Sequence, residues 1–403
     1  MPTQSSLPWR RLTAAILFAT ACSSTAALRA QCFASQPSWL PGAGVAGTDS
    51  PVQAMLEWDP DGAGPAPARI VLGGGFRAAG SLAVDGLVAY DPIAGTFGLV
   101  DAAAGGNRLV GWVSALAQLP NGNLVAAGSF QLGDSFHSIA IWNGSAWASL
   151  GGDGSASIVA LAVRSNGNII AGGTQLQLGA VTANMVAEWN GTSWSDLGNG
   201  LTGQGVVNTL KFLPNGALVA GGVFGPGNIA VRNGNSWSGL GSGIAGRVQS
   251  VVTLANGDLI AGGEFLTAGS VICNHIARWN GSTWSSLGSG INGLAPVAGG
   301  PIVHDLRLLA NGSVLVAGAF TTAGATLARS LATWDGFAWS PIADGVEGRV
   351  VSTLESSDGS LWLGGQIRRS LTSQAATPSV IVENVIRRRN GVWSALARAP
   401  PAA

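Results

Sequence analysis

The chain has 403 residues, about half of them hydrophobic, which is enough to bury a large core. Charged residues make up only 10% of the chain and give a formal net charge of zero, so the surface lacks the basic patches that hold nucleic-acid phosphates or an anionic membrane. Nucleic acid is therefore not an expected partner. The 61 glycines recur at fixed places among apolar runs, which indicates many tight turns in an ordered protein.

The first 30 residues have the layout of a secretory signal peptide. Arg10 and Arg11 precede an apolar run at residues 12–21, and small residues follow up to Ala30. The apolar run is too short to span a bilayer, and no later segment is suited to it. We expect residues 1–30 to be removed and the mature protein to be secreted, periplasmic or attached at the cell surface.

The three cysteines are too few for a disulfide scaffold or a thiolate metal site, so no metal is expected. Cys22 ends the segment ATAC, which weakly resembles a lipoprotein cleavage box. Ala19 stands where leucine is typical, so we do not expect lipid anchoring. Cys32 and Cys273 remain after cleavage, and they either pair in an oxidising compartment or are both buried thiols.

A Gly-Gly or similar small pair, followed in most copies by Phe two residues later, repeats along the mature chain every 41–55 residues. The second glycine of each pair is Gly74, Gly128, Gly173, Gly222, Gly263, Gly318 or Gly365. An Asn-Gly or Asp-Gly dipeptide lies upstream of every pair. Such dipeptides accept positive φ at both central positions, so we predict type I′ hairpin turns.

The copy at residues 247–290 shows how one unit is expected to fold. VQSVVTL and DLIAGGEF read as strands on either side of Asn256-Gly257, and NHIARW and TWSSL as strands on either side of Asn280-Gly281. Seven such units predict an all-β chain that forms a single seven-bladed β-propeller with four-stranded antiparallel blades, and eight blades are the alternative.

The propeller is expected to span residues 31–397, followed by a disordered tail at residues 398–403. Two segments compete for the closing fourth strand. SWLPGAGV at residues 38–45 precedes the first unit, and VWSAL at residues 392–396 ends the last one. Either strand could close the ring and thereby remove an exposed sheet edge.

The Gly-Gly pair, the aromatic residue that ends the third strand and the tryptophan of the fourth strand resemble kelch-type blades, as in the central domain of galactose oxidase. The phrases LPNGxLVAGGxF and IARWNGSxWSSLG are more similar to kelch-like repeats of large secreted bacterial proteins, most of them without known function. The resemblance implies a fold and little about activity. Galactose oxidase-like catalysis needs tyrosine and histidine copper ligands, whereas the one tyrosine, Tyr90, occupies a repeated structural position. Neither copper oxidase activity nor any other cofactor is expected.

Propeller geometry sorts the connections onto two faces. The tight turns after the first and third strands share one face, and the longer, variable connections after the second and fourth strands share the other, which we call the loop-rich face. A functional site is expected on the loop-rich face. His275, His304 and Arg349 are the candidates there for catalysis. Candidates for ligand binding are Arg108, Trp112, His137, Arg247 and Glu347.

Each candidate also has a structural interpretation. No His-x-His or His-x-x-x-His spacing links the histidines, and they belong to different units. Arg247 and Arg349 occupy equivalent positions just before a first strand. They could bind an anion or a sugar acid, or pair with neighbours such as Glu347.

Tryptophans recur in pairs five residues apart on either side of the second turn, as at Trp279 and Trp284. This spacing predicts a cross-strand pair buried between blades, and carbohydrate stacking is the alternative. We therefore expect a secreted, non-catalytic binding module that contacts a protein or a carbohydrate at the cell surface. The alternative is an extracellular lyase or glycosidase that uses the loop-rich face.

Overall fold

The computed structural model describes residues 45–62, 64–101, 108–152, 156–293, 300–371 and 379–396. Within these ranges all regular structure is β-strand, and no helix is present that could cross a membrane. The described residues belong to one compact unit. The predicted signal peptide, Cys22, Cys32 and the predicted C-terminal tail lie outside the described residues, so the expectations about them stay predictions.

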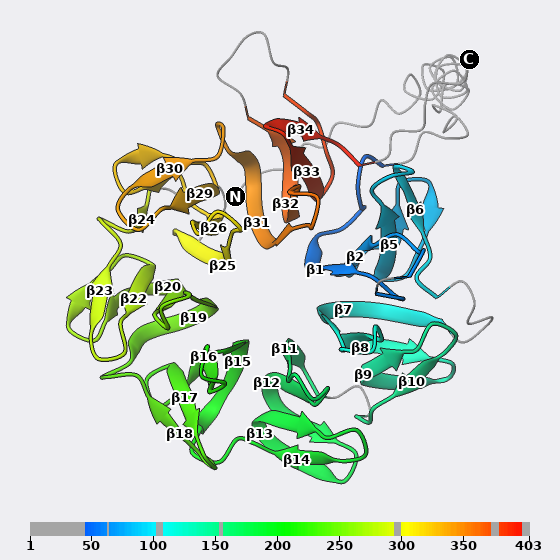
Figure 1. Cartoon of the computed structure of the whole chain (residues 1–403), viewed down its shortest axis with the longest axis horizontal. Coiled ribbons are helices and arrows are strands. Elements are labelled where there is room, and N and C mark those ends of the chain that lie inside the picture. Colours follow the sequence, from blue (N-terminus) through cyan, green and yellow to red (C-terminus); the bar gives the residue numbers. More distant parts are fainter. Residues whose placement is uncertain are drawn as a thin grey trace, which may run out of the picture. The chain divides into compact units, whose positions relative to one another are not determined.

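Antiparallel sheets of four main strands, here called blades 1 to 7 in chain order, surround a common centre (Figure 1). Blade 1 contains β1 (Val52–Trp58), β2 (Arg69–Gly74), β5 (Leu87–Asp91) and β6 (Thr96–Gly98). Blade 2 contains β7 (Leu109–Gln118), β8 (Leu124–Leu132), β9 (Ser135–Trp142) and β10 (Trp147–Ser149). Blade 3 contains β11 (Ile158–Val163), β12 (Ile169–Leu178), β13 (Val181–Trp189) and β14 (Trp194–Asp196). Blades 4 and 5 contain β15 (Thr202–Phe212), β16 (Leu218–Gly225), β17 (Ile229–Asn233) and β18 (Ser236–Gly239); and β19 (Ile244–Thr253), β20 (Leu259–Ala268), β22 (Ile276–Trp279) and β23 (Trp284–Ser286). Blades 6 and 7 contain β25 (Ile302–Leu308), β26 (Val314–Ala319), β29 (Leu331–Trp334) and β30 (Trp339–Pro341); and β31 (Val346–Glu355), β32 (Leu361–Ser370), β33 (Val385–Arg389) and β34 (Val392–Ser394). The fold is an all-β propeller, and the seven described blades are consistent with the predicted number.

The remaining short strands lie in the connections after second and fourth strands. They are β3 (Ala78–Ala79), β4 (Leu82–Ala83), β21 (Val271–Ile272), β24 (Ile291–Asn292), β27 (Thr322–Ala323) and β28 (Thr326–Leu327). The connections after the first and third strands contain no such strand in the described ranges. The structure therefore has the two unequal faces that the sequence predicts.

The first strand of each blade carries a β-bulge at the same position, and the second glycine of the repeated pair makes room for it. In blade 5 the register shifts after the pair Val248–Gly263, so Gln249 is an extra residue on β19. A Cβ on Gly263 would lie 2.1 Å from the carbonyl oxygen of Arg247, so glycine is required. The residues at this bulge position are Gln53, Ser114, Val159, Asn208, Gln249, His304 and Val351.

The first glycine of the pair lets neighbouring blades approach each other. A Cβ on Gly262 in blade 5 would lie 2.4 Å from Cγ1 of Val303 in blade 6. A Cβ on Gly364 in blade 7 would lie 2.9 Å from Cγ1 of Val52 in blade 1. Because the last and first blades make the same contact as consecutive ones, the core between blades continues around the ring.

The type I′ prediction for the Asn-Gly and Asp-Gly turns upstream of the repeated pairs is wrong, because in these dipeptides only the glycine has positive φ. Among the second turns that the structure describes, Asn390-Gly391 has positive φ at both positions, 48° and 82°. In the turn after β7, only Gly122 has positive φ, and the backbone N–H of Asn123 donates to Oδ1 of Asn121 (3.1 Å). The asparagine side chain thus stabilises its own turn, as Asx turns do, while glycine supplies the left-handed residue.

The paired tryptophans lie between blades, as predicted. The ring centroids of Trp279 and Trp284 are 5.2 Å apart, and both side chains are buried. Nε1 of Trp284 donates to the carbonyl oxygen of Leu240 in the preceding blade (3.1 Å). Equivalent bonds from Trp194, Trp237 and Trp339 reach Leu150, Leu197 and Leu287. These four tryptophans therefore join blades 3 to 6 each to the preceding blade.

Among the described residues, blade 7 is completed by its own fourth strand. Residues 392–394 form β34, the fourth strand of blade 7, whereas Val45 is the only described residue of the competing segment 38–45. The N–H of Thr48 donates to the carbonyl oxygen of Glu383 (3.0 Å), and Nδ2 of Asn384 donates to that of Thr48 (2.6 Å). The same two kinds of contact join blade 4 to blade 5, so closure repeats an ordinary blade junction.

Candidate functional site

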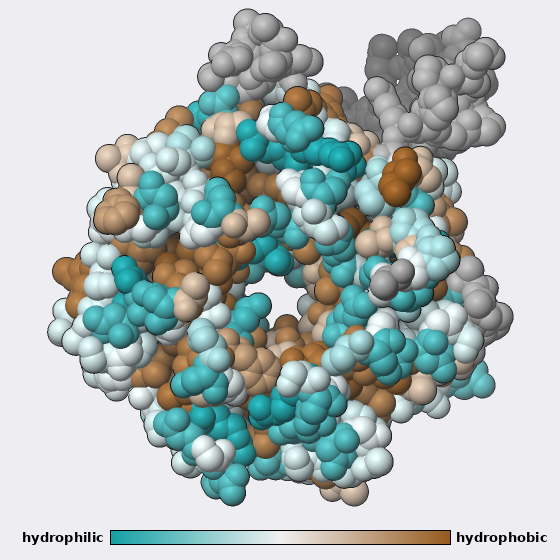
Figure 2. Space-filling model, viewed as in Figure 1, coloured by the Kyte–Doolittle hydropathy of each residue, from teal (hydrophilic) through white to brown (hydrophobic). Residues whose placement is uncertain are grey.

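A channel runs through the centre of the ring, and its opening is visible in Figure 2. It encloses about 390 Å³, within the range of roughly 300–1,000 Å³ that is typical of small-molecule sites. Its wall is formed by the first strands of all seven blades. The lining residues are Gln53, Ala54, Met55, Ala115, Leu116, Val159, Ala160, Leu161, Asn208, Thr209, Leu210, Lys211, Gln249, Ser250, His304, Asp305, Arg307, Val351, Ser352 and Thr353.

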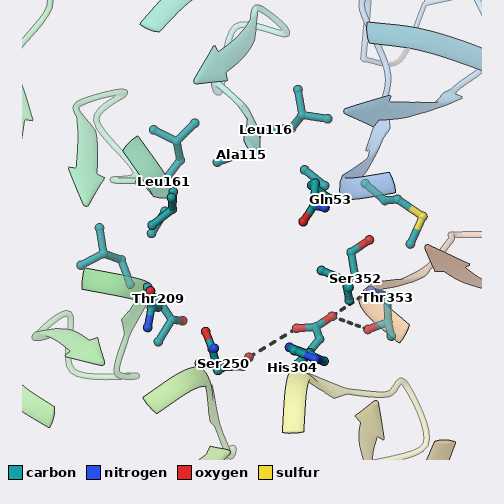
Figure 3. A pocket seen from close by; sticks show the side chains of 18 of the residues that line it. Gln53, Ala115, Leu116, Leu161, Thr209, Ser250, His304, Ser352 and Thr353 are labelled. Carbon is teal, nitrogen blue, oxygen red and sulfur yellow. Dashed lines mark hydrogen bonds between the residues drawn. The ribbon is translucent and has the colours of Figure 1, made fainter. Parts of the chain in front are cut away.

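The two sides of the channel differ in chemistry. Blades 2 and 3 contribute only apolar side chains, among them Leu116 and Leu161. Polar and charged side chains gather on the opposite side, where Ser250, His304 and Thr353 lie across the opening from the leucines (Figure 3). The channel can therefore hold a molecule that has one apolar and one polar face.

Asp305 is the only carboxylate among the lining residues, and its oxygens are fully engaged. Oδ1 accepts hydrogen bonds from the N–H of Leu306 (2.9 Å) and the hydroxyl of Ser250 (3.3 Å). Oδ2 accepts from the N–H (2.8 Å) and the hydroxyl (2.6 Å) of Thr353 (Figure 3). Asp305 thus links the first strands of blades 5, 6 and 7.

His304 is the bulge residue of blade 6 and faces this polar side (Figure 3). Its Nε2 is buried without a hydrogen-bond partner among the described residues. Desolvation, followed by the nearby charge of Arg349, lowers the pKa of His304 from 6.5 to about 4, although Asp305 acts in the opposite direction. The imidazole is therefore neutral at physiological pH.

Lys211 is a channel residue that the sequence analysis missed. It is the single lysine of the chain, beside 19 arginines. Desolvation by the surrounding wall lowers the pKa of Lys211, although its side chain stays accessible to solvent inside the channel. The composition could have drawn attention to Lys211, because one lysine in 403 residues is unusual. Its position in a strand, however, does not show that it lines a channel until all the blades are placed around the centre.

Of the three catalytic candidates, only His304 lines the channel. Arg349 lies two residues before the bulge residue Val351 in β31, and its Nε is buried without a described partner. His275 has positive φ (71°), and its carbonyl oxygen accepts from the N–H of Gly263 (3.0 Å). The equivalent residues Gly86, Asn228, Ser330 and Asn384 also have positive φ and make the same backbone bond. His275 therefore occupies a repeated turn position, and the histidines do not share one site.

The residues predicted to bind a ligand near the channel lie at its loop-rich end. Arg247 and Arg349 are equivalent, as expected, but lie within first strands and not before them. Nε of Arg247 is 3.9 Å from a carboxylate oxygen of Glu264. Glu347 forms an ion pair with Arg369 (2.6 Å), across the hairpin of blade 7. These exposed pairs leave charged groups at the surface, where solvent screens them.

Arg108 and His137 have partners within their own blade region. Nε of Arg108 is 3.1 Å from Oδ1 of Asp101, whose Oδ2 also accepts from Nε1 of Trp147 (3.0 Å). Nδ1 of His137 forms a hydrogen bond with the hydroxyl of Ser149 (2.9 Å). Both side chains therefore contribute to local structure.

Large apolar side chains are exposed mainly on the loop-rich face. There, in the first strands, at the ends of second and third strands and in the connections between them, they are Val110, Trp112, Phe136, Leu266, Ile272, Leu327 and Ile381. Ile93, Phe337 and Val392 are exposed at third-to-fourth-strand turns instead. Trp112, at 47% exposure, lies over the backbone of Gly75 near the channel.

No group of three or more potential metal-ligating side chains occurs in the part of the chain that the structure describes. Cys273 is a buried thiol whose Sγ lies 3.6 Å from the carbonyl oxygen of Leu266. Burial raises its pKa to about 11, so the thiol is protonated and unreactive at neutral pH. Because Cys32 is not described, the alternative of a disulfide stays a prediction.

Comparisons with known proteins agree with this fold. A model of the Rax2 C-terminal beta propeller domain matches residues 63–215, less than half of the chain. The chain is a β-propeller. The extracellular domain of BT4673 from B. thetaiotaomicron is similar in structure, with a TM-score of 0.51 and 11% identity over 78% of this chain. The chain spans only 37% of that domain.

The structure of YCF48 bound to D1 peptide is also similar, with a TM-score of 0.50 and 14% identity over 80% of this chain and 92% of the other. A comparison with curated proteins found no match. At these identities the structural similarities show the fold alone.

Proposed function

We propose that this protein is a non-catalytic binding module that acts outside the cell or at its surface, and that a protein partner binds its loop-rich face. The observation that carries this proposal is the concentration of exposed apolar side chains on that face. Exposed apolar surface is unfavourable in water and commonly marks a site of association.

The exposed side chains stand on extensions of the blades. In blade 2, Trp112 is 47% and Phe136 54% exposed, and both belong to strands that continue beyond the bulge toward this face. In blade 5, Leu266 is 58% and Ile272 72% exposed, at the end of β20 and in β21. These extensions present apolar groups that the packing of the blades does not require.

The composition of this face favours a protein over a carbohydrate. Carbohydrates are commonly bound by stacking on aromatic rings, whereas five of the seven exposed residues on the face are Leu, Ile or Val. The regular tryptophan pairs, which could have offered stacking platforms, are buried between blades. Aliphatic side chains are suited to contact with the apolar side chains of a protein.

The distribution of the catalytic candidates supports a binding role over the lyase or glycosidase alternative. His304 faces the channel, while His275 occupies a turn position outside its lining. Acid–base catalysis requires groups within hydrogen-bonding reach of one substrate. Export and the kelch-like assignment are part of the proposal and rest on the N-terminal segment and on the repeated phrases of the sequence.

The test compares two triple variants in capture from the extracellular fraction of the host. The face variant carries Trp112→Ser, Leu266→Ser and Ile272→Ser, and the control carries Ile93→Ser, Phe337→Ser and Val392→Ser at exposed turns. We expect wild type and control to retain one protein in common, which is then purified and titrated, and the face variant to bind it at least about tenfold more weakly. Equal binding by both variants would contradict the proposed surface. Binding to a glycan array in place of a protein would favour the carbohydrate partner, and release of products from a polysaccharide panel would favour the enzyme.

A further inference from the structure

We propose that the central channel is a binding site for a small organic anion, with a carboxylate seated beside Lys211 and Arg307 and an apolar body against Leu116 and Leu161. This site is separate from the loop-rich surface of the proposed function. It does not depend on a partner binding there.

The charges that line the channel do not balance. Lys211 and Arg307 contribute two cations, whereas Asp305 is the only carboxylate and is occupied by its four hydrogen bonds. Arg307 is held in place by bonds from Nε and Nη2 to the carbonyl oxygen of Thr353. No ion pair or hydrogen bond of the Lys211 ammonium is present among the described residues, although Asp305 is near enough to act on it electrostatically. A confined cation without a partner is a binding group for an anion.

The position of Lys211 in the repeat shows that the fold does not require a cation there. The equivalent residues three positions after each bulge are Leu56, Ala117, Ala162, Lys211, Val252, Arg307 and Leu354. Five of these seven are apolar, and only Lys211 and Arg307 line the channel. A chain with no other lysine therefore has its single ammonium group at a position where an aliphatic side chain suits the blade.

The remainder of the wall defines the rest of the ligand. Leu116 and Leu161 lie across the opening from Ser250 and His304 (Figure 3). Nε2 of His304 is a buried polar atom without a described partner, so the polar side of the wall contains an unsatisfied hydrogen-bonding group. A space of about 390 Å³ accommodates a compact organic acid and not a folded chain. A carboxylate with a short hydrocarbon body matches both sides of the wall.

The single lysine gives a direct measurement. Protein that contains ¹³C-labelled lysine shows one side-chain Cε signal in NMR, and hexanoate is the probe. We expect hexanoate to shift this signal and to raise the pKa of Lys211, because a bound carboxylate stabilises the ammonium form. Hexanamide, which has the same shape and no charge, is expected to leave the signal unchanged. Acetate tests the contribution of the hydrocarbon body, and inorganic phosphate tests whether any anion suffices.

The variants are Lys211→Met, which introduces a side chain of the aliphatic kind found in equivalent positions, and Arg389→Met, which removes an exposed cation far from the channel lining. Ligand-observed NMR should show hexanoate binding about tenfold or more weaker to Lys211→Met and unchanged for Arg389→Met. Should hexanoate leave the Lys211 signal unmoved, or bind Lys211→Met as well as wild type, the proposal would be overturned. Equal effects of acetate and hexanoate would contradict the proposed contact between the hydrocarbon body and the apolar wall. If no protein partner binds the loop-rich face while hexanoate still binds the channel, the proposed function has failed and this site has not.

Discussion

Replacing His304 with glutamine should remove one cause of the loss of folding stability at acidic pH, namely protonation of this channel histidine. The same bulge position holds Gln53 in blade 1 and Gln249 in blade 5, so His304→Gln introduces a residue that the blade already accepts. The variant keeps a polar group in the channel and lacks the titrating imidazole. Its stability relative to wild type should therefore change with pH.

The magnitude follows from the pKa of His304, which desolvation and then the charge of Arg349 lower from 6.5 to about 4. Below pH 6.5 His304 becomes protonated in the unfolded chain but stays neutral in the folded chain, so the wild-type protein loses stability as the pH falls toward 4. The loss amounts to about 2 kcal/mol near pH 5 and about 3 kcal/mol near pH 4, relative to neutral pH.

Denaturant unfolding of wild type and His304→Gln at a series of pH values measures this difference. Carboxylates titrate in both proteins, so their contribution cancels when the two free energies of unfolding are subtracted. The difference should be constant above about pH 7 and should shift in favour of the variant as the pH falls. A difference that stays constant down to about pH 4 would refute the account of His304. Introducing Arg349→Met into both proteins should raise the pKa of His304 in the folded state, because one of the two causes of the lowered pKa is then absent, and the pH-dependent difference should become smaller.

Three further substitutions test the packing. Gly263→Ala should lower the free energy of unfolding by more than about 2 kcal/mol in denaturant titration, because its Cβ would meet the carbonyl oxygen of Arg247. Trp284→Phe should lower it by about 1–3 kcal/mol, since the carbonyl oxygen of Leu240 loses its donor from the next blade. Lys211→Met should raise the thermal midpoint at neutral pH, measured by circular dichroism, because desolvation disfavours the ammonium form.

Two of these substitutions have a matched control. Gly98→Ala adds a Cβ that meets no heavy atom within 4 Å, so it should leave stability almost unchanged. Trp112→Phe alters an exposed ring and should not affect unfolding. Loss of stability in Lys211→Met would show that the lysine has a structural role, and equal effects of Gly263→Ala and Gly98→Ala would contradict the close approach at the bulge.

The blades could be predicted from the sequence because their signals are local and repeated. Alternating apolar residues, the Gly-Gly pair and the tryptophans around each second turn all act within about 45 residues, and several copies average out the exceptions. Even so, the turn type was wrong, because Asx bonds such as that of Asn121 stabilise a turn in which glycine alone is left-handed. The repeat also predicted the burial of Trp279 and Trp284 between blades.

The channel could not be predicted, because its wall combines two to four residues from each of seven strands that lie far apart in the chain. The bulge in β25 directs His304 toward the centre, whereas the backbone of His275 occupies a turn position. Nothing near either histidine in the sequence distinguishes the two. Lys211 was visible as the single lysine, but its lowered pKa and missing partner exist only when the other blades surround it. Local periodicity determines how each blade folds, whereas desolvation and charge balance at the centre depend on the closed ring, and only the tertiary structure decided them.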